Sequence, residues 1–259
     1  MVKAIWTALL LCIFSWTGVY GQEQGTKEAP PDMVNIPGGE FTMGSSEGDD
    51  DERPVHTASV KGFWMDMYEV TNAQYKVFVD MTNHRIPYNV WDGREVWKDN
   101  SFPEEAANQP VINVSWDDAV AYCRWLGKRL PTETEWERAA RGGLDGKRYP
   151  WGDGPPEGRA WLGGRWAMAK TLKPVGSYSP NGYGLYDMAG NTSEWVSSAP
   201  LPYPYAADDG REEPEGYEKR VLRGGSWRDA PIFLRCANRA AYIATARMNV
   251  MGFRCARDE

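Results

Sequence analysis

The 259-residue sequence has few of the side chains that most often carry enzyme chemistry, with two histidines and four cysteines. His56 and His84 lie far apart and match no spacing of metal ligands, so we expect packing or surface roles for both. The sequence has no Ser-His-Asp grouping, no P-loop and no glycine-rich dinucleotide motif in a suitable context. It therefore gives no support to proteolytic or nucleotide chemistry.

Positive charge and long apolar runs are also scarce. The formal net charge is −7, and no Lys/Arg cluster is present, which argues against a nucleic-acid partner. The apolar run Ala4–Phe14 follows Lys3, is too short for a membrane span and is typical of an export signal. We expect residues 1–21 to be a cleaved signal peptide, which predicts a secreted or periplasmic protein without a membrane span. An uncleaved N-terminal anchor is the alternative.

The abundant residues indicate an irregular fold. The 27 glycines, 13 tryptophans and 13 tyrosines suit tight turns whose gaps are filled by aromatic rings. Residues 22–32 are polar with two prolines and predict a linker, and residues 33–257 are expected to form one domain. Three helices followed by irregular chain predict the α+β class with little regular secondary structure.

Helix caps and alternating patterns locate the expected elements. Met33–Met43 predicts a hairpin that turns at Pro37-Gly38-Gly39. The acidic segment Ser45–Arg53 is expected to be a solvated loop, with a cation site as the alternative. The other expected elements are a strand within His56–Met67, helices from Thr71 to about Asn83, from Ser115 to Gly127 and from Thr132 to Gly142, and short strands near Lys173–Val175 and Val221–Arg223.

A series of motifs follows in order along the chain: IPGGEFTMGS (Ile36–Ser45), YEVTNAQY (Tyr68–Tyr75), PVINVSWDDAVAYCRWLGKRLPTETEWERAARGG (Pro110–Gly143), YPWGD (Tyr149–Asp153), PVGSYSPNGYGLYDMAGNTSEW (Pro174–Trp195), RVLRGGSW (Arg220–Trp227) and GFRCAR (Gly252–Arg257). Together these motifs closely resemble the formylglycine-generating enzyme family, also called sulfatase-modifying factor domains, from Met33 to Arg257. The resemblance implies a single compact domain with a C-type-lectin-like fold. The best-known members oxidise a cysteine of a sulfatase to formylglycine with oxygen and copper, and paralogues without the active-site cysteines act otherwise.

The cysteines argue against the family's best-known reaction. A copper oxidase of this kind needs two thiolates that converge on one metal, because soft sulfur ligands favour Cu(I). The resemblance places the first active-site cysteine at Asp229, which is a hard carboxylate. The segment that follows is shorter than in the family, and Ala230–Leu234 holds no cysteine. Copper is therefore not expected in this chain.

Removal of the signal, which contains Cys12, leaves three cysteines, enough for one disulfide and one free thiol in an oxidising compartment. The resemblance implies a disulfide between Cys123 and Cys255, worth about 5 kcal/mol in the loop-entropy model. Cys236 is expected to be a buried, unpaired thiol. The alternative is a reactive thiol whose pKa is lowered by Arg235 and Arg239.

The resemblance also implies one structural calcium ion in the segment LYDMAGNTSEW. Hard cations prefer carboxylate and carbonyl oxygens. The expected ligands are the side chains of Asp187 and Glu194 and the carbonyls of Gly190 and Thr192. The alternative is that these carboxylates only hydrogen-bond the loop.

The resulting hypothesis is an exported family member without copper-dependent oxidase activity, which recognises or helps to mature a protein or small-ligand partner. Arg228 would pair with an anionic ligand group and Trp227 would stack on the ligand. The alternatives are an oxidase that forms formylglycine or matures a partner by a divergent site, and a lectin-like binding module. Arg228 and Asp229 could instead form a weak surface ion pair. The candidate groove consists of Ser226, Trp227, Arg228, Asp229 and Cys236.

Overall fold

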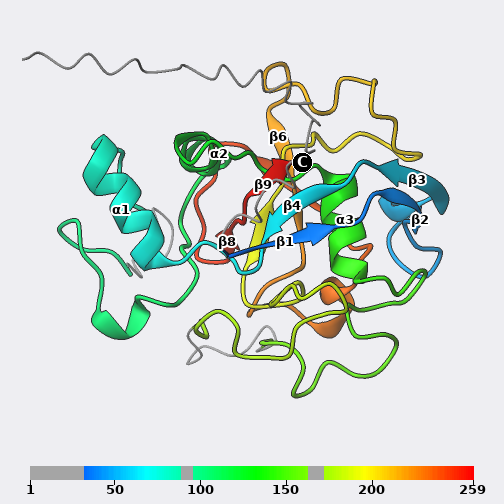
Figure 1. The fold of residues 1–259 in the computed structure, drawn as a ribbon, viewed down its shortest axis with the longest axis horizontal. Coiled ribbons are helices and arrows are strands. Elements are labelled where there is room, and N and C mark those ends of the chain that lie inside the picture. The colour runs from blue at the N-terminus through cyan, green and yellow to red at the C-terminus, as the bar shows by residue number, and fades with distance from the viewer. Residues whose placement is uncertain (1–31, 89–95, 163–171) are drawn as a thin grey trace, which may run out of the picture.

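The computed structural model describes residues 32–88, 96–162 and 172–259. Short strands and helices alternate with long loops (Figure 1), which confirms the predicted α+β class. The predicted signal peptide and nearly all of the predicted linker lie outside the described residues. The elements are β1 (Met33–Ile36), β2 (Gly39–Met43), β3 (His56–Val60), β4 (Phe63–Asp66), α1 (Asn72–Thr82), α2 (Trp116–Trp125), α3 (Glu133–Arg141), β5 (Ser193–Trp195), β6 (Lys219–Arg223), β7 (Ala240–Ile243), β8 (Met251–Gly252) and β9 (Ala256–Asp258), with 3-10 turns at Asp50–Glu52, Glu104–Ala106 and Pro231–Leu234.

The first four strands form one long antiparallel ribbon. β1 pairs with β4 and β2 pairs with β3, in one continuous register. The break falls at Pro37, which has no N–H to donate, and at Gly38, where an added Cβ would lie 2.7 Å from the Gly62 nitrogen. The predicted hairpin within Met33–Met43 is therefore wrong. The chain continues in the same direction past Pro37, and residues 44–55 make the turn.

All three predicted helices are confirmed: the capping boxes at Thr71 and Thr132 form as the sequence indicates, and the predicted cap Ser115 also forms a box. The side chains of Thr71, Ser115 and Thr132 each accept a hydrogen bond from the backbone N–H of the residue three positions later. That residue's side chain in turn accepts a hydrogen bond from the backbone N–H of the capping residue. α1 ends at Asn83 and α3 at Gly142, both in the left-handed conformation. Local sequence thus determines these boundaries.

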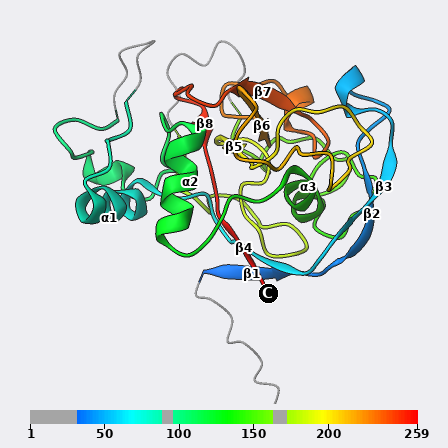
Figure 2. The same cartoon turned by 90° about the horizontal axis from the view of Figure 1, so that it is seen from above.

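Two buried clusters hold the helices against the strands. Tyr75 of α1 stacks on Tyr122 of α2, with ring centroids 5.6 Å apart, in a cluster that also contains Phe253. Trp136 of α3 packs in a second cluster with strand residues that include Phe63. Figure 2 accordingly shows α1 and α2 towards one end of the molecule and α3 towards the other.

The C-terminal tail crosses the molecule and joins two sheets. β6 and β8 flank β5 in a four-stranded sheet of order β7-β6-β5-β8. β9 pairs with β4 at the edge of the sheet of order β1-β4-β9. The predicted strand near Val221–Arg223 is part of β6, whereas Lys173–Val175 forms no strand. Cys123 of α2 and Cys255 form the expected disulfide, with Cα atoms 5.8 Å apart. Within the described ranges, no helix has the length and apolar character needed to cross a membrane.

Candidate functional site

The segment after β6 makes a tight turn that is closed by Asp229. Gly225 has a φ of +66°, and a Cβ added to it would lie 2.6 Å from the carbonyl oxygen of Phe233. The backbone N–H and the hydroxyl of Ser226 donate to Oδ2 of Asp229 at 2.8 and 2.7 Å. Asp229 therefore stands where the resemblance places a catalytic cysteine, but its carboxylate holds the turn together.

Trp227 and Arg228 occupy different environments within this turn. Trp227 is 6% exposed, packs with Ile112 and Leu172, and donates its indole N–H to the Asn249 carbonyl at 3.1 Å. Its buried ring is not available to stack on a ligand as the sequence suggested. The exposed Arg228 places its guanidinium carbon 5.7 Å from the centre of this ring. No ion pair between Arg228 and Asp229 forms, so that alternative is wrong.

A second tryptophan and a second cation lie beside the first pair. Trp161 packs against the cluster that contains Trp227, and Nζ of Lys173 lies 4.7 Å from the centre of the Trp161 ring. The buried Asn191 links both pairs: its backbone N–H donates to the Trp161 carbonyl at 3.0 Å, and its carbonyl accepts from Trp227 at 2.9 Å. Its Oδ1 accepts the Lys173 N–H at 3.1 Å. No sequence motif indicated Lys173, whereas Asn191 stands within a motif.

Cys236 is a free, buried thiol, as expected. It belongs to the buried cluster in which strand and loop residues pack against α3 residues, including Ala140. Burial raises the pKa of its thiol to about 12, and the nearby Arg141 and Arg223 only partly oppose this rise. Arg235 and Arg239, which the sequence offered as activating charges, are not the guanidiniums that act on it. Cys236 is therefore protonated near neutral pH.

The arginines of the tail instead neutralise buried carboxylates. Arg239 donates to both oxygens of Glu133 at 2.6 and 2.9 Å. Arg235 binds Glu52 in the same two-pronged way, at 2.6 Å for each bond. Glu52 lies in the segment that we expected to be a solvated loop, but it is fully buried. This part of the prediction is wrong, because a distant arginine draws the acidic segment into the interior.

The cation alternative for this loop gains no support from its geometry. Asp49, Asp51 and Glu52 are the one group of three or more His, Cys, Asp or Glu side chains close enough to share an ion within the described ranges. Both oxygens of Glu52 already bind Arg235, however, and the two aspartates are exposed. Exposed acidic groups of this kind are common without an ion.

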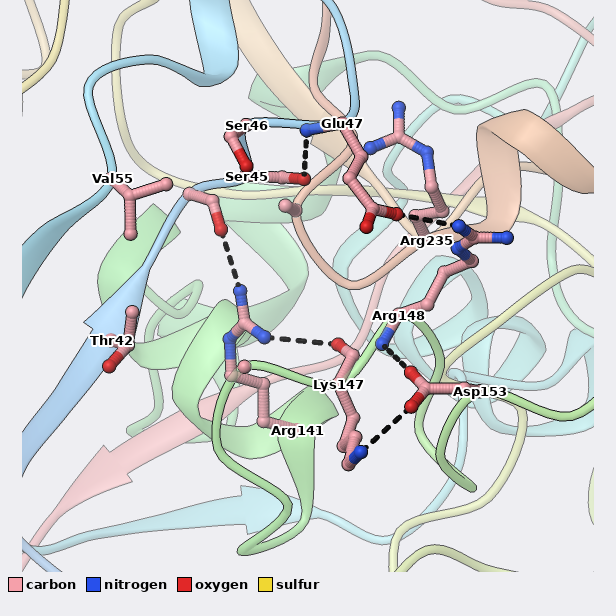
Figure 3. A pocket seen from close by; sticks show the side chains of 13 residues that line it. Thr42, Ser45, Ser46, Glu47, Val55, Arg141, Lys147, Arg148, Asp153 and Arg235 are labelled. Carbon is pink, nitrogen blue, oxygen red and sulfur yellow. Dashed lines mark hydrogen bonds and ion pairs between the residues drawn. The ribbon is translucent and has the colours of Figure 1, made fainter.

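A charged cavity of about 330 Å³ lies between this loop and α3 (Figure 3). At its rim, Arg148 pairs with Glu47 at 2.6 Å and Lys147 pairs with Asp153 at 2.8 Å. Deeper in the cavity, Arg141 binds the buried Glu137 at 2.6 Å, and Arg235 binds Glu52. Each cation already has a carboxylate, so the cavity offers no uncompensated charge to a ligand.

The expected calcium ligands lie on either side of a turn. Glu194 is buried and accepts two hydrogen bonds from Arg254, at 2.8 and 2.7 Å, and one from the indole of Trp136 at 2.8 Å. Asp187 accepts the Gly176 N–H at 2.7 Å. Because each carboxylate oxygen can accept two bonds, Oε1 of Glu194 retains a free acceptor site.

A third carboxylate, which the sequence analysis missed, faces the same turn. Glu69 is fully buried and accepts from the Asn191 amide at 2.7 Å and from the Thr192 N–H at 3.0 Å. Burial, together with the charges of Asp187 and Glu194, raises the pKa of Glu69 well above its ordinary value. Burial also raises the pKa of Asp187. The region thus carries more negative than positive groups.

The sequence matches the family model of the sulfatase-modifying factor enzyme 1-like domain over residues 21–259. The chain belongs to this family. It is 38% identical to the formylglycine-generating enzyme of Streptomyces coelicolor, over 87% of this chain and 89% of that protein. It is also 35% identical to the inactive C-alpha-formylglycine-generating enzyme 2 of Mus musculus, over 87% and 85% of the two chains.

Solved structures agree with this family assignment. PvdO from Pseudomonas aeruginosa has a TM-score of 0.71 and 30% sequence identity, and the match covers 88% of this chain and 94% of PvdO. CarF has a TM-score of 0.66 and 27% identity, with 89% and 99% coverage. The family that the sequence motifs indicated is therefore confirmed, and so is its fold.

Proposed function

We propose that this chain is an exported member of the sulfatase-modifying factor family without copper-dependent cysteine oxidase activity. It recognises, or helps to mature, a protein or small-ligand partner through the site around Ser226–Asp229. Its relatives include a protein named formylglycine-generating enzyme and one named inactive C-alpha-formylglycine-generating enzyme 2, at similar identity. The activity is therefore inferred from the residues of the site. The apolar run near the N-terminus and the Cys123–Cys255 disulfide support export, because disulfides persist in oxidising compartments.

The observation that carries this proposal is the chemistry of the metal-binding side chains at the site, because the family reaction would need two thiolates there. Asp229 supplies a hard oxygen donor and is engaged by Ser226. Cys236 is buried with a pKa of about 12, and Cys123 and Cys255 are joined to each other. These side chains do not fit a Cu(I) ion, which favours soft thiolates. No reaction step through copper follows from them.

A copper assay tests this proposal directly. Purified protein is titrated with Cu(I) against a colorimetric chelator, and a cysteine-containing sulfatase peptide is then incubated with it in air and followed by mass spectrometry. We expect no tight Cu(I) binding and no aldehyde product. Tight binding with aldehyde formation would support the alternative of a divergent oxidase. A Cys236→Ala variant then shows whether that thiol had been recruited.

The lectin-like alternative makes a different prediction. A glycan array would show selective, saturable binding of particular sugars if the chain were a lectin-like module. We expect no such binding, because Lys173 and Arg228 lie over the two tryptophan rings at this turn and Trp227 is buried. Selective glycan binding that survives the Arg228→Gln change would favour the lectin-like module over our proposal.

We also propose that the turn between Asp187 and Glu194 binds one structural calcium ion, with the carbonyls of Gly190 and Thr192 as further ligands. The imbalance of charge supports this site: three carboxylates, those of Glu69, Asp187 and Glu194, face one guanidinium, that of Arg254. A divalent cation would offset that excess and would accept carboxylate and carbonyl oxygens. Its role would be to stabilise the turn.

Thermal unfolding with and without calcium tests this second proposal. We expect calcium at about 100-fold excess over its Kd to stabilise the protein by about 2.7 kcal/mol, by mass action. Asp187→Asn should remove this gain, whereas Asp153→Asn, at an exposed aspartate outside the turn, should keep it. An unchanged melting temperature at millimolar calcium, or an equal gain in the Asp187→Asn protein, would contradict the site.

A further inference from the structure

Two tryptophan–cation pairs, Trp161 with Lys173 and Trp227 with Arg228, pack against one apolar cluster at the Ser226–Asp229 turn. Nζ of Lys173 is 4.7 Å from the centre of the Trp161 ring, and Cζ of Arg228 is 5.7 Å from the centre of the Trp227 ring. Both rings belong to one apolar cluster. The rings attract the cations through their negative faces and therefore hold them in place.

Neither cation has a carboxylate partner within the described residues. Lys173 and Arg228 take part in none of the ion pairs there. By contrast, Arg148 and Arg235 at the charged cavity each pair with a carboxylate. The carboxylate in the same turn, Asp229, accepts both bonds from Ser226 on its Oδ2 atom. Lys173 and Arg228 are thus two cations without an ion-pair partner among the described residues, on a chain of net charge −7.

The backbone holds the two pairs in a fixed relation. Asn191 bonds to the chain at Trp161, Lys173 and Trp227, and it is 1% exposed. Because one buried residue ties together the backbone of three segments, the positions from which both cations extend are preorganised. Preorganisation lowers the entropy that a ligand loses when it binds.

We propose that Lys173 and Arg228 form an anion-recognition surface whose ligand is an acidic peptide. This inference rests on the function proposed above and names its ligand class. Arg228 is exposed and Lys173 is half-buried, and each lies over a tryptophan ring, a geometry that suits an extended chain with several carboxylates. A lone small molecule would need a more enclosed pocket. The guanidinium of Arg228 is suited to bind a carboxylate with two parallel hydrogen bonds.

Fluorescence anisotropy with labelled peptides tests this inference. The probes are three fluorescein-labelled heptapeptides in which glycine alternates with Glu, Gln or Lys. We expect the Glu peptide to bind most tightly and to weaken as salt is added, because the site is at the surface. The Lys173→Gln and Arg228→Gln changes should each weaken binding about tenfold, as expected for the loss of a charge-assisted hydrogen bond.

A matched variant distinguishes this site from the general charge of the protein. Lys76→Gln removes a half-exposed cation of α1 that pairs with Asp80 at 2.7 Å, and it should leave binding unchanged. Equal binding of the Glu and Gln peptides, no binding of the Glu peptide, or equal weakening by Lys76→Gln would overturn the acidic-peptide inference. Those results would leave the copper and aldehyde assays unchanged, and it is these assays that test the proposed function.

Discussion

Removal of one partner of the ion pair between Glu52 and Arg235 should destabilise the protein far more than removal of one partner of a surface pair of the same chemistry. Glu52 is fully buried and the side chain of Arg235 is 3% exposed. Arg235 donates to each carboxylate oxygen at 2.6 Å. In an Arg235→Met variant, the hydrogen bond left to this carboxylate is the one from the Asp49 N–H at 3.3 Å. The buried charge would then be nearly uncompensated.

The expected cost follows from this geometry. Loss of one partner of a buried pair costs about 3–5 kcal/mol, so Arg235→Met should lower the melting temperature by roughly 10 °C. Glu52→Met should cost a similar amount, since it leaves a buried guanidinium. The double variant removes both charges and should lie within about 2 kcal/mol of the wild type. The resulting coupling energy is about 4 kcal/mol or more.

Urea unfolding of the four proteins measures this cycle, with Arg148→Met as the matched control. Arg148 binds Glu47 at the same 2.6 Å, but the two side chains are 46% and 65% exposed. Exposed pairs contribute about 0–1 kcal/mol, so this control should scarcely change stability. Additive effects in the Glu52–Arg235 cycle, or an equal loss in the control, would refute our account of how the acidic loop is held.

Three further predictions concern stability. Replacing both Cys123 and Cys255 by Ala should cost up to about 5 kcal/mol, measured by urea unfolding under non-reducing conditions. Burial favours a raised pKa for Asp118, but hydrogen bonds from the side chains around it lower the pKa below 3.8. The stability that it contributes should be present above pH 3.8 and be lost as the pH falls through the lower folded-state pKa, and Asp118→Asn should remove that part of the acid transition in pH-dependent unfolding. Gly225→Ala should destabilise more than Gly158→Ala, because both have a positive φ but only Gly225 would bring its Cβ within 2.6 Å of a backbone oxygen. Equal losses in thermal unfolding would show that the contact is irrelevant.

The helices could be predicted because their start signals are local. Thr71, Ser115 and Thr132 carry capping boxes within four residues, and the capping geometry needs nothing from the rest of the fold. The free, buried state of Cys236 also agreed with the sequence argument. Its surroundings did not, because the guanidiniums that act on it belong to Arg141 and Arg223.

Strand pairing could not be predicted in the same way. Met33–Met43 has the alternation of two strands and the residues of a turn, yet Pro37 only interrupts a ladder that continues beyond it. The site could not be predicted for the same reason, because its residues come together through contacts between distant segments. Lys173 has no motif of its own, and it reaches the Trp161 ring because Asn191 bonds to both segments.

The sequence by itself determined the family, the three capped helices and the absence of a cysteine at position 229, where Asp229 stands. Tertiary structure alone decided that Asp229 closes a turn, that Glu52 is buried against Arg235 and that two cations lie unpaired over tryptophan rings. The physical reason is the range of the interactions. Caps and motifs act over a few neighbouring residues, whereas burial and charge pairing depend on which distant segments the fold brings together.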